Sequence, residues 1–329
     1  MPKWVIAVQG KPPSTLTIHF RTMGQMNSYV FFFIGALLLL NGCKKEETIT
    51  YSNNTIPEYD NVSTLLIENY VNRLFIDLIG REPTDEELSQ ETAVLENANL
   101  SINSRKALVD KIMTDETTSL DNITYKSAYH NKLYEDLKAR FLAGASEADL
   151  MSTYYLYYVI SVQDSLNNNM LAYEINRNRA NIMLGVMNCK TELQTGAITL
   201  REACRRMCFN QTYDDINMNS FNYINATFDD LFFRYPTAAE LDQAFPPVDY
   251  NSSGYLFGTT ITSKSEYIAL LVSNAEFDEG SVRWAYNSLL GREPLSGELF
   301  ALLPVFSAND NYQAIQKAIA ITDEYAGWN

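Results

Sequence analysis

Apolar side chains recur at helical spacing through most of this 329-residue chain. Every fourth residue is apolar in one stretch, which contains Tyr125, Tyr129, Leu133, Leu137 and Phe141. That spacing predicts one apolar helix face. Segments 149–162 and 174–188 predict two more helices, and the polar run 165–169 predicts the turn between them. The sequence contains no convincing hairpin of alternating apolar residues, so the pattern predicts an all-α fold.

The sequence Gly-Arg-Glu-Pro occurs twice, each time after an apolar helical run. Gly80 and Gly291 can adopt the left-handed conformation that ends a helix, and proline disfavours helix in the residue before it. A third copy has Phe233 in the glycine position. The shared corner residues are Arg81, Pro83 and Glu87, then Arg234, Pro236 and Glu240, then Arg292, Pro294 and Glu298. Each copy predicts a helix end followed by a helix start.

The residue after each corner proline influences how the next helix begins. Thr84 and Thr237 are each followed three residues later by glutamate and predict capping boxes, whereas Leu295 offers no capping side chain. Each copy closes with an apolar-periodic helix that ends near Glu116, Glu276 or Glu324. A further ending of this kind, residues 196–213, has no recognisable front half. The pattern predicts helical repeats of about 50 residues, none of which buries its apolar face alone.

The corner arginines have two interpretations. As structural groups they would bind helix-end carbonyls and the nearby glutamate. As a clamp they would contact a binding partner. Recurrence of the same corner favours the structural interpretation, because a clamp is needed only once.

The first 42 residues have the pattern of a secretion signal. Tyr29–Leu40 is apolar and uncharged, and its 12 residues are too few for a membrane span, which needs about 20. It leads into Leu-Asn-Gly-Cys, which resembles the lipobox of bacterial lipoproteins. The resemblance implies that 1–42 is a signal peptide, that Cys43 is lipidated and that 43–61 is a polar tether. An unusually early start and a mis-assigned start before Met26 are both open.

The predicted mature chain is strongly acidic. Residues 1–42 hold three basic side chains and no acidic one, so their removal leaves 22 of the 25 basic side chains against 40 acidic ones, a net charge of −18. Such a surface repels nucleic acid and anionic lipid. Acyl chains on Cys43 would then be the membrane attachment. We expect an outer-membrane location, facing the periplasm or the cell exterior.

The predicted body has a first helical repeat at 62–119, a helical insertion at 120–195 and later repeats at 196–329. Some of these segments resemble known modules. Residues 192–241 are similar to the phycobilisome linker domain, in which a G-x-I-x-V-R-x-F helix leads to a helix closing on L-G-R-x-P. Residues 288–325 resemble a short L-G-R-x-P-D repeat of bacterial surface proteins. Residues around the first corner resemble the opening of a domain attached to some bacterial cytochromes. The resemblance implies an all-α module that holds other proteins or organises a surface, without catalytic residues.

The sequence contains few side chains or motifs suited to catalysis, cofactor binding or metal binding. His130 is the single histidine of the predicted mature chain, and no Gly-rich phosphate loop or haem-attachment motif occurs. We therefore expect no enzymatic activity, no cofactor and no metal site. After lipidation of Cys43, the remaining cysteines are Cys189, Cys204 and Cys208. In an oxidising compartment a disulfide from Cys189 to Cys204 or Cys208 and free thiols at these positions are both open, whereas a Cys204–Cys208 bond on one helix has poor geometry.

A tyrosine cluster is the candidate binding surface, with a plain core helix as the alternative. It comprises Tyr154, Tyr155, Tyr157 and Tyr158, and adjacent helical positions cannot all face one core. Exposed tyrosine suits sugar stacking or a protein interface. The predicted function is a lipid-anchored envelope protein that binds other envelope proteins as a scaffold or accessory subunit. The alternative is a glycan- or nutrient-capturing surface lipoprotein, and a hydrolase is the third class.

Overall fold

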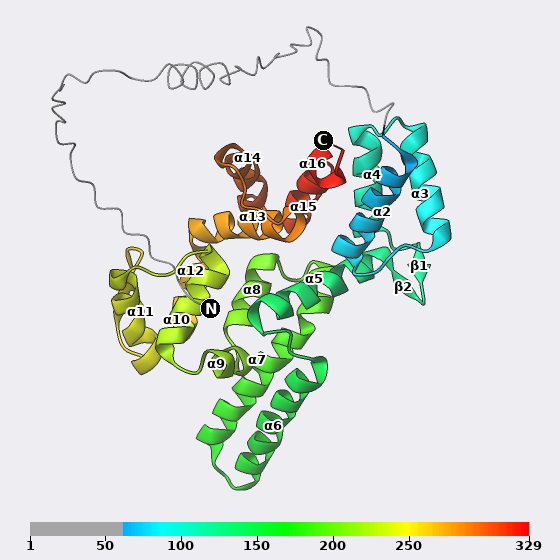
Figure 1. Ribbon diagram of the computed structural model, residues 1–329. Helices are drawn as coiled ribbons and strands as arrows, with labels where there is room; N and C mark the ends of the chain where they lie inside the picture. Colours follow the sequence, from blue (N-terminus) through cyan, green and yellow to red (C-terminus); the bar gives the residue numbers. More distant parts are fainter. Residues whose placement is uncertain (1–61, 329) are drawn as a thin grey trace, which may run out of the picture. The chain divides into compact units, whose positions relative to one another are not determined.

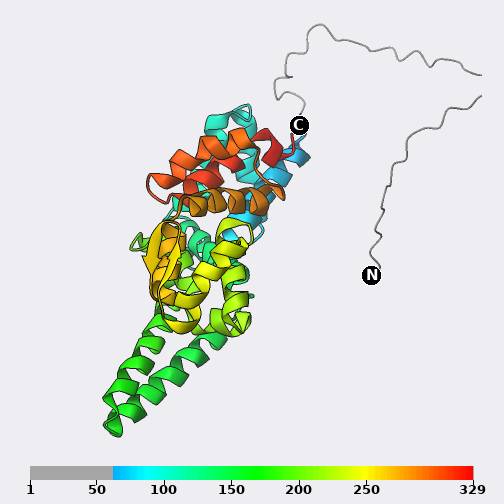
Figure 2. The ribbon, with the colours of Figure 1, turned by 90° about the vertical axis from the view of Figure 1, so that its left-hand side faces the viewer.

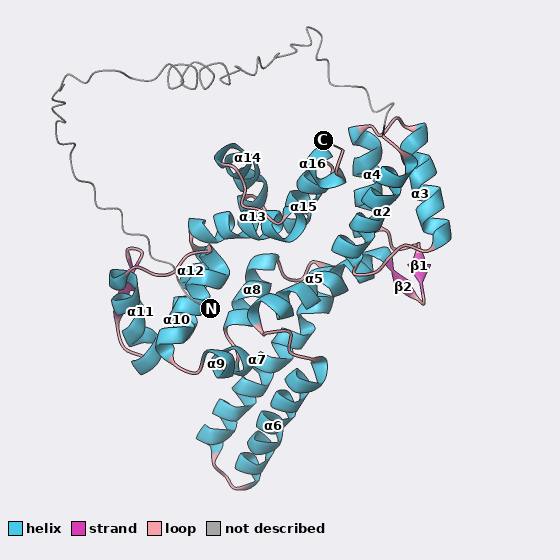
Figure 3. Ribbon diagram, viewed as in Figure 1, coloured by secondary structure: helices cyan, strands magenta, loops and turns pink. Residues whose placement is uncertain are grey.

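The computed structural model describes residues 62–328, so the predicted signal peptide, Cys43 and the tether lie outside the described residues. The described part is all-α, as predicted, with 15 helices and two small hairpins (Figures 1 and 3). Among residues 62–328, no helix combines the length and the apolar character that crossing a membrane requires.

The first half of the described chain contains three helices, a long central helix and a helical hairpin. The helices are α2 (Thr64–Ile79), α3 (Asp85–Asn97), α4 (Ile102–Thr114), α5 (Tyr125–Phe141), α6 (Glu147–Leu166) and α7 (Met170–Thr195). The predicted apolar face of α5 is confirmed, since all five of its side chains are buried. The turn predicted between α6 and α7 is also confirmed. Figure 2 shows these two helices side by side.

Shorter helices form the second half. They are α8 (Leu200–Cys208), α9 (Gln211–Asn217), α10 (Ser220–Phe232), α11 (Ala238–Tyr250), α12 (Lys264–Ser273), α13 (Ala275–Leu290), α14 (Ser296–Ser307), α15 (Tyr312–Ala320) and α16 (Asp323–Ala326). The three corner sequences join α2 to α3, α10 to α11 and α13 to α14.

Two antiparallel hairpins interrupt the helices, and the expectation that the chain has no hairpin is wrong. Strand β1 (Ser119–Leu120) pairs with β2 (Ile123–Thr124), and β3 (Gly254–Leu256) pairs with β4 (Thr259–Ile261). Both two-residue turns have positive φ at each position, as in type I′ turns. Strands of two or three residues are too short to display an alternating pattern.

The first and last described segments pack against each other. The Tyr70 hydroxyl on α2 donates a hydrogen bond of 3.0 Å to the carbonyl of Ala320 on α15. Arg105 on α4 is almost fully buried and donates to the carbonyl of Ile321 at 2.6 Å and to Asp323 at 2.7 Å. One cluster of buried apolar side chains extends from α2 to α16. The segments predicted as first and later repeats therefore share a core.

Candidate interaction surfaces

The three corners share one set of hydrogen bonds. Each arginine donates two bonds of 2.7–2.9 Å to the glutamate six residues later; the pairs are Arg81–Glu87, Arg234–Glu240 and Arg292–Glu298. Each also donates to the carbonyl of the residue that follows it. That carbonyl belongs to the corner, whereas the sequence predicted a helix-end carbonyl. Bidentate arginine–carboxylate pairs of this kind are strong and geometrically specific.

Two corners are closed by a second carboxylate from a later helix. Arg234 donates to Glu276, near the start of α13, at 2.6 and 2.9 Å. Arg292 donates to Glu324 in α16, with both bonds at 2.6 Å. Each of these arginines therefore connects its corner to a later helix, α13 for Arg234 and α16 for Arg292.

The first corner is closed by a hydroxyl group. Glu116, at the matching sequence position, forms an ion pair with Lys126 at 2.5 Å. The Tyr125 hydroxyl, at the start of α5, donates to Glu87 at 2.7 Å. Burial favours protonation of Glu87, but bonds from Arg81, Tyr125 and the Thr84 N–H outweigh burial and lower its pKa from 4.5 to about 2.

The capping boxes predicted at Thr84 and Thr237 are confirmed. Each hydroxyl accepts from the N–H of the glutamate three residues later, at 3.2 and 3.3 Å, and that glutamate accepts from the threonine N–H at 2.8 and 2.7 Å. At the third corner Glu298 accepts from the Leu295 N–H at 2.6 Å, but leucine has no oxygen to return the bond. Half of the box therefore forms there.

The helix ends before the corners all adopt the left-handed conformation. Gly80 and Gly291 have φ of 73° and 66°, as the sequence predicted. Phe233 has φ of 57°, an unfavourable value for a residue with a β-carbon. The Arg140 guanidinium lies 4.3 Å from the centre of the Phe233 ring, and this cation–π contact offsets part of the strain.

In the structure no disulfide joins Cys189 to Cys204 or Cys208. All three cysteines are buried and carry free thiols. The Cys189 thiol donates to the Gly185 carbonyl within its own helix at 3.3 Å. Burial raises the pKa of Cys189 and Cys204 to about 12. A disulfide depends on the relative placement of α7 and α8, which residue spacing does not determine.

The one histidine of the described residues has a structural role. His130 is buried, and its Nδ1 donates to the Lys126 carbonyl at 2.7 Å. Burial lowers the pKa of His130, which favours the neutral ring. Residues 62–328 contain no cluster of three or more metal-ligating side chains.

One cavity of about 450 Å³, lined by side chains of α2, α5, α13 and α15, contains two carboxylates. Asp77 accepts from the Tyr325 hydroxyl at 2.9 Å, and Asp136 pairs with Lys132. Burial raises the pKa of Asp136, and the bond from Lys132 opposes that rise. Both carboxylates are thus engaged by other side chains.

The tyrosine cluster is divided between two surroundings. Tyr155 is exposed, whereas its three neighbours are half-buried. The rings of Tyr154 and Tyr158 stack with centroids 5.8 Å apart, and Arg177 of α7 lies over Tyr158. The Tyr157 hydroxyl donates to Gln211 at 2.8 Å. Three tyrosines therefore join α6 to its neighbours, and Tyr155 alone faces outward.

Tyr155 belongs to an exposed apolar line on α6, which we call the α6 stripe. Its members are Met151, Tyr155, Val159, Val162 and Leu166, and they are 40–78 % exposed. Their spacing of three or four residues places them on one face. Only Leu150 and Ser161 are buried in this 20-residue helix. The candidate binding surface predicted from the sequence includes Tyr155 but misses the other members of the stripe, because that prediction rests only on the tyrosines of this segment.

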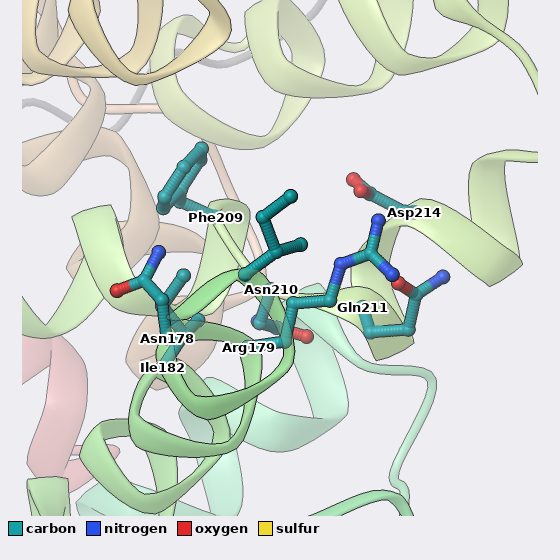
Figure 4. A pocket seen from close by; sticks show the side chains of 8 residues that line it. Asn178, Arg179, Ile182, Phe209, Asn210, Gln211 and Asp214 are labelled. Carbon is teal, nitrogen blue, oxygen red and sulfur yellow. The ribbon is translucent and has the colours of Figure 1, made fainter. Parts of the chain in front are cut away.

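A second surface, the α7 groove, lies between α7 and the α8–α9 segment. Two cavities of about 290 and 610 Å³ share the lining residues Asn178, Ile182 and Phe209. Figure 4 shows the smaller cavity, where Arg179 extends toward Asp214. Burial raises the pKa of Asp214, and Lys264, which donates to it, opposes that rise.

Unbonded amides distinguish the α7 groove. Among the described residues, Asn178, Asn181 and Asn188 have exposed side chains that form no hydrogen bond with the protein. These asparagines fall three and seven residues apart on one side of α7. Their spacing is visible in the sequence, but the opposing wall that makes a groove is not.

Comparison with known proteins identifies no relative: no family model, curated protein or solved structure matches this chain.

Proposed function

We propose that this chain is a lipid-anchored envelope protein that binds other envelope proteins as a scaffold or accessory subunit, without catalytic activity of its own. Acyl chains on Cys43 would attach it to the outer membrane. The α6 stripe is the observation that carries the proposal. Its apolar side chains are exposed on a regular 20-residue helix, and contiguous exposed apolar surface marks interaction sites.

The proposal also includes the helical repeats that the sequence predicts at the corners. The shared Arg–Glu bonds support three copies of one helical unit at the corners, with α5, α6 and α7 inserted after the first. In this interpretation the repeats form the rigid body and the inserted hairpin presents the binding surface. A hydrolase is the least supported class, because Asp77 and Asp136 already have hydrogen-bonding partners in their cavity.

Affinity capture from gently solubilised membranes tests the function. Tagged full-length chain at native abundance should recover defined partners in fixed stoichiometry. Val159→Glu should reduce their recovery at least tenfold, because the stripe would have to bury a charge. Gln243→Glu is the matched control: it adds the same charge to an exposed position on a different helix, α11. A partnerless chain, or equal loss with both variants, would refute the proposal.

The α7 groove favours a second function, capture of a glycan or another polar nutrient. Free amides together with the Phe209 ring suit hydroxyl-rich ligands. A glycan array would identify such a ligand, and Asn178→Ala with Asn181→Ala should weaken its binding. Asn225→Ala, which removes an amide bonded within α10, is the control. A pure scaffold would bind nothing on the array.

A further inference from the structure

We propose that the partner of the α6 stripe is a second copy of this chain, paired antiparallel so that two hairpins form a four-helix bundle. This inference rests on the proposed function, since it names the occupant of the same surface. The α7 groove would remain available to other proteins or ligands.

The spacing of the stripe suits antiparallel self-pairing. A twofold axis passing between positions 158 and 159 brings Met151 of one copy opposite Leu166 of the other. The same axis brings Tyr155 opposite Val162. It also brings the two copies of Val159 near each other beside the axis, because Tyr158 on the same turn faces Arg177 of α7. Each exposed apolar side chain thus meets an apolar or aromatic side chain, as a twofold interface requires.

The charges of α6 favour the antiparallel over the parallel arrangement. The helix has three acidic side chains, at Glu147, Asp149 and Asp164, and no basic one. Asp164 accepts a hydrogen bond from Asn176 of α7 and does not face the partner. In a parallel pair the exposed Glu147 and Asp149 would lie beside the same two residues of the other copy, and like charges in opposition are costly. In the antiparallel pair the twofold axis places them opposite positions 170 and 168. Those positions hold Met170 and Asn168, so no acidic pair forms.

The available area is sufficient for a weak specific dimer. At 40–78 % exposure, the stripe and the adjacent Leu156 offer roughly 600 Å² of side-chain surface per copy, or about 1,200 Å² in a pair. That is the lower end of the range for stable interfaces. Anchoring both copies in one membrane would raise their effective concentration and favour pairing.

Cysteine cross-linking of the full-length chain in its own membranes tests the arrangement. Val159→Cys lies beside the axis and should give a chain of doubled mass on a non-reducing gel after mild oxidation. Tyr155→Cys alone should give no cross-link. Residue 155 faces residue 162 of the partner, and the partner's own residue 155 lies about seven residues, or about 10 Å, further along that helix, beyond the reach of a disulfide. Co-expression of Tyr155→Cys and Val162→Cys chains should restore the cross-link.

The native cysteines of the described residues should form no competing cross-links, because all three thiols are buried. Gln243→Cys, at an exposed position on α11, is the control and should stay monomeric. Dimers from Tyr155→Cys alone would indicate parallel pairing and overturn the proposal. No dimer from either Val159→Cys or the mixed pair would also overturn it. If a photoreactive residue at position 159 then captured a different protein, the proposed scaffold function would stand while self-pairing failed.

Discussion

Arg234→Ala is the most informative change in the corners. Arg234 donates five hydrogen bonds: two to Glu240, two to Glu276 and one to the Tyr235 carbonyl. Arg292 donates as many, but its two glutamates are more exposed to water, at 29 and 43 % against 16 and 35 %. Arg81 has a single carboxylate partner, whose bonds from Thr84 and Tyr125 would survive its loss.

The magnitude follows from the Glu240 pKa, which the Arg234 bonds and, less strongly, Thr237 lower from 4.5 to about 2. That difference corresponds to at most about 3 kcal/mol. Arg234 is one-third exposed, so water screens part of the interaction, and the bonds from Thr237 remain in the variant. We therefore expect Arg234→Ala to lower the free energy of unfolding by about 2 kcal/mol, and Arg81→Ala and Arg292→Ala by about 1 kcal/mol each.

The pH dependence gives the sharper test. Because the folded pKa of Glu240 lies below its ordinary value, its stabilising contribution is complete above pH 4.5 and is lost as the pH falls toward 2. The difference in free energy of unfolding between wild type and Arg234→Ala, measured with urea, should therefore be largest at pH 7 and become smaller below pH 4.5. Partner binding by the folded variant should be unchanged.

The control is Arg283→Ala, which removes an exposed ion pair with Glu293 and should change stability by less than about 0.5 kcal/mol. If Arg234→Ala at pH 7 also changed the free energy of unfolding by less than about 0.5 kcal/mol, the reasoning would be contradicted. A difference from wild type that stays constant as the pH falls would contradict it as well. A variant that keeps full stability but loses its partners would instead establish the corner as a binding clamp.

Three further changes have definite expected outcomes. Leu295→Thr should raise the free energy of unfolding by about 1 kcal/mol, because Glu298 already supplies half of the capping box and threonine would supply the other half; an unchanged urea midpoint would show that the cap does not form. The buried cysteines should resist a thiol reagent in the folded chain and react only after denaturation; they are Cys189, Cys204 and Cys208. Labelling of any of them at native pH would contradict their burial. Cys43→Ala should abolish fatty-acid labelling and partitioning into detergent, and wild-type behaviour of this variant would exclude the lipobox interpretation.

The sequence predicts those parts of the fold whose causes are local. The left-handed helix ends at Gly80 and Gly291 and the boxes at Thr84 and Thr237 each depend on residues within a few positions of one another. The closing bonds to Glu276 and Glu324 join residues 42 and 32 positions apart. The sequence therefore predicts that these glutamates end similar helices, but not that they bind the corner arginines.

The α6 stripe shows a different limit of the sequence. An apolar residue at helical spacing predicts a face that must be covered, but not what covers it. Val159 lies within α6 and Leu142 directly follows α5, and both are apolar. Leu142 is nevertheless buried, whereas Val159 is 59 % exposed. The difference depends on which helices pack nearby, which only the tertiary arrangement supplies. The same holds for the α7 groove, whose second wall comes from α8 and α9.

The packing of α2 and α4 against α15 and α16 also has a consequence for how the chain reaches its native state. The bond from Tyr70 to Ala320 spans 250 residues. Such contacts form only after a long loop has closed, and they slow folding. The part of the apolar surface of α2 and α4 that packs on α15 and α16 must therefore remain uncovered until the last residues have been synthesised. During that interval this surface is open to aggregation, so folding would depend on chaperones that hold the first half of the chain until the last helices are available.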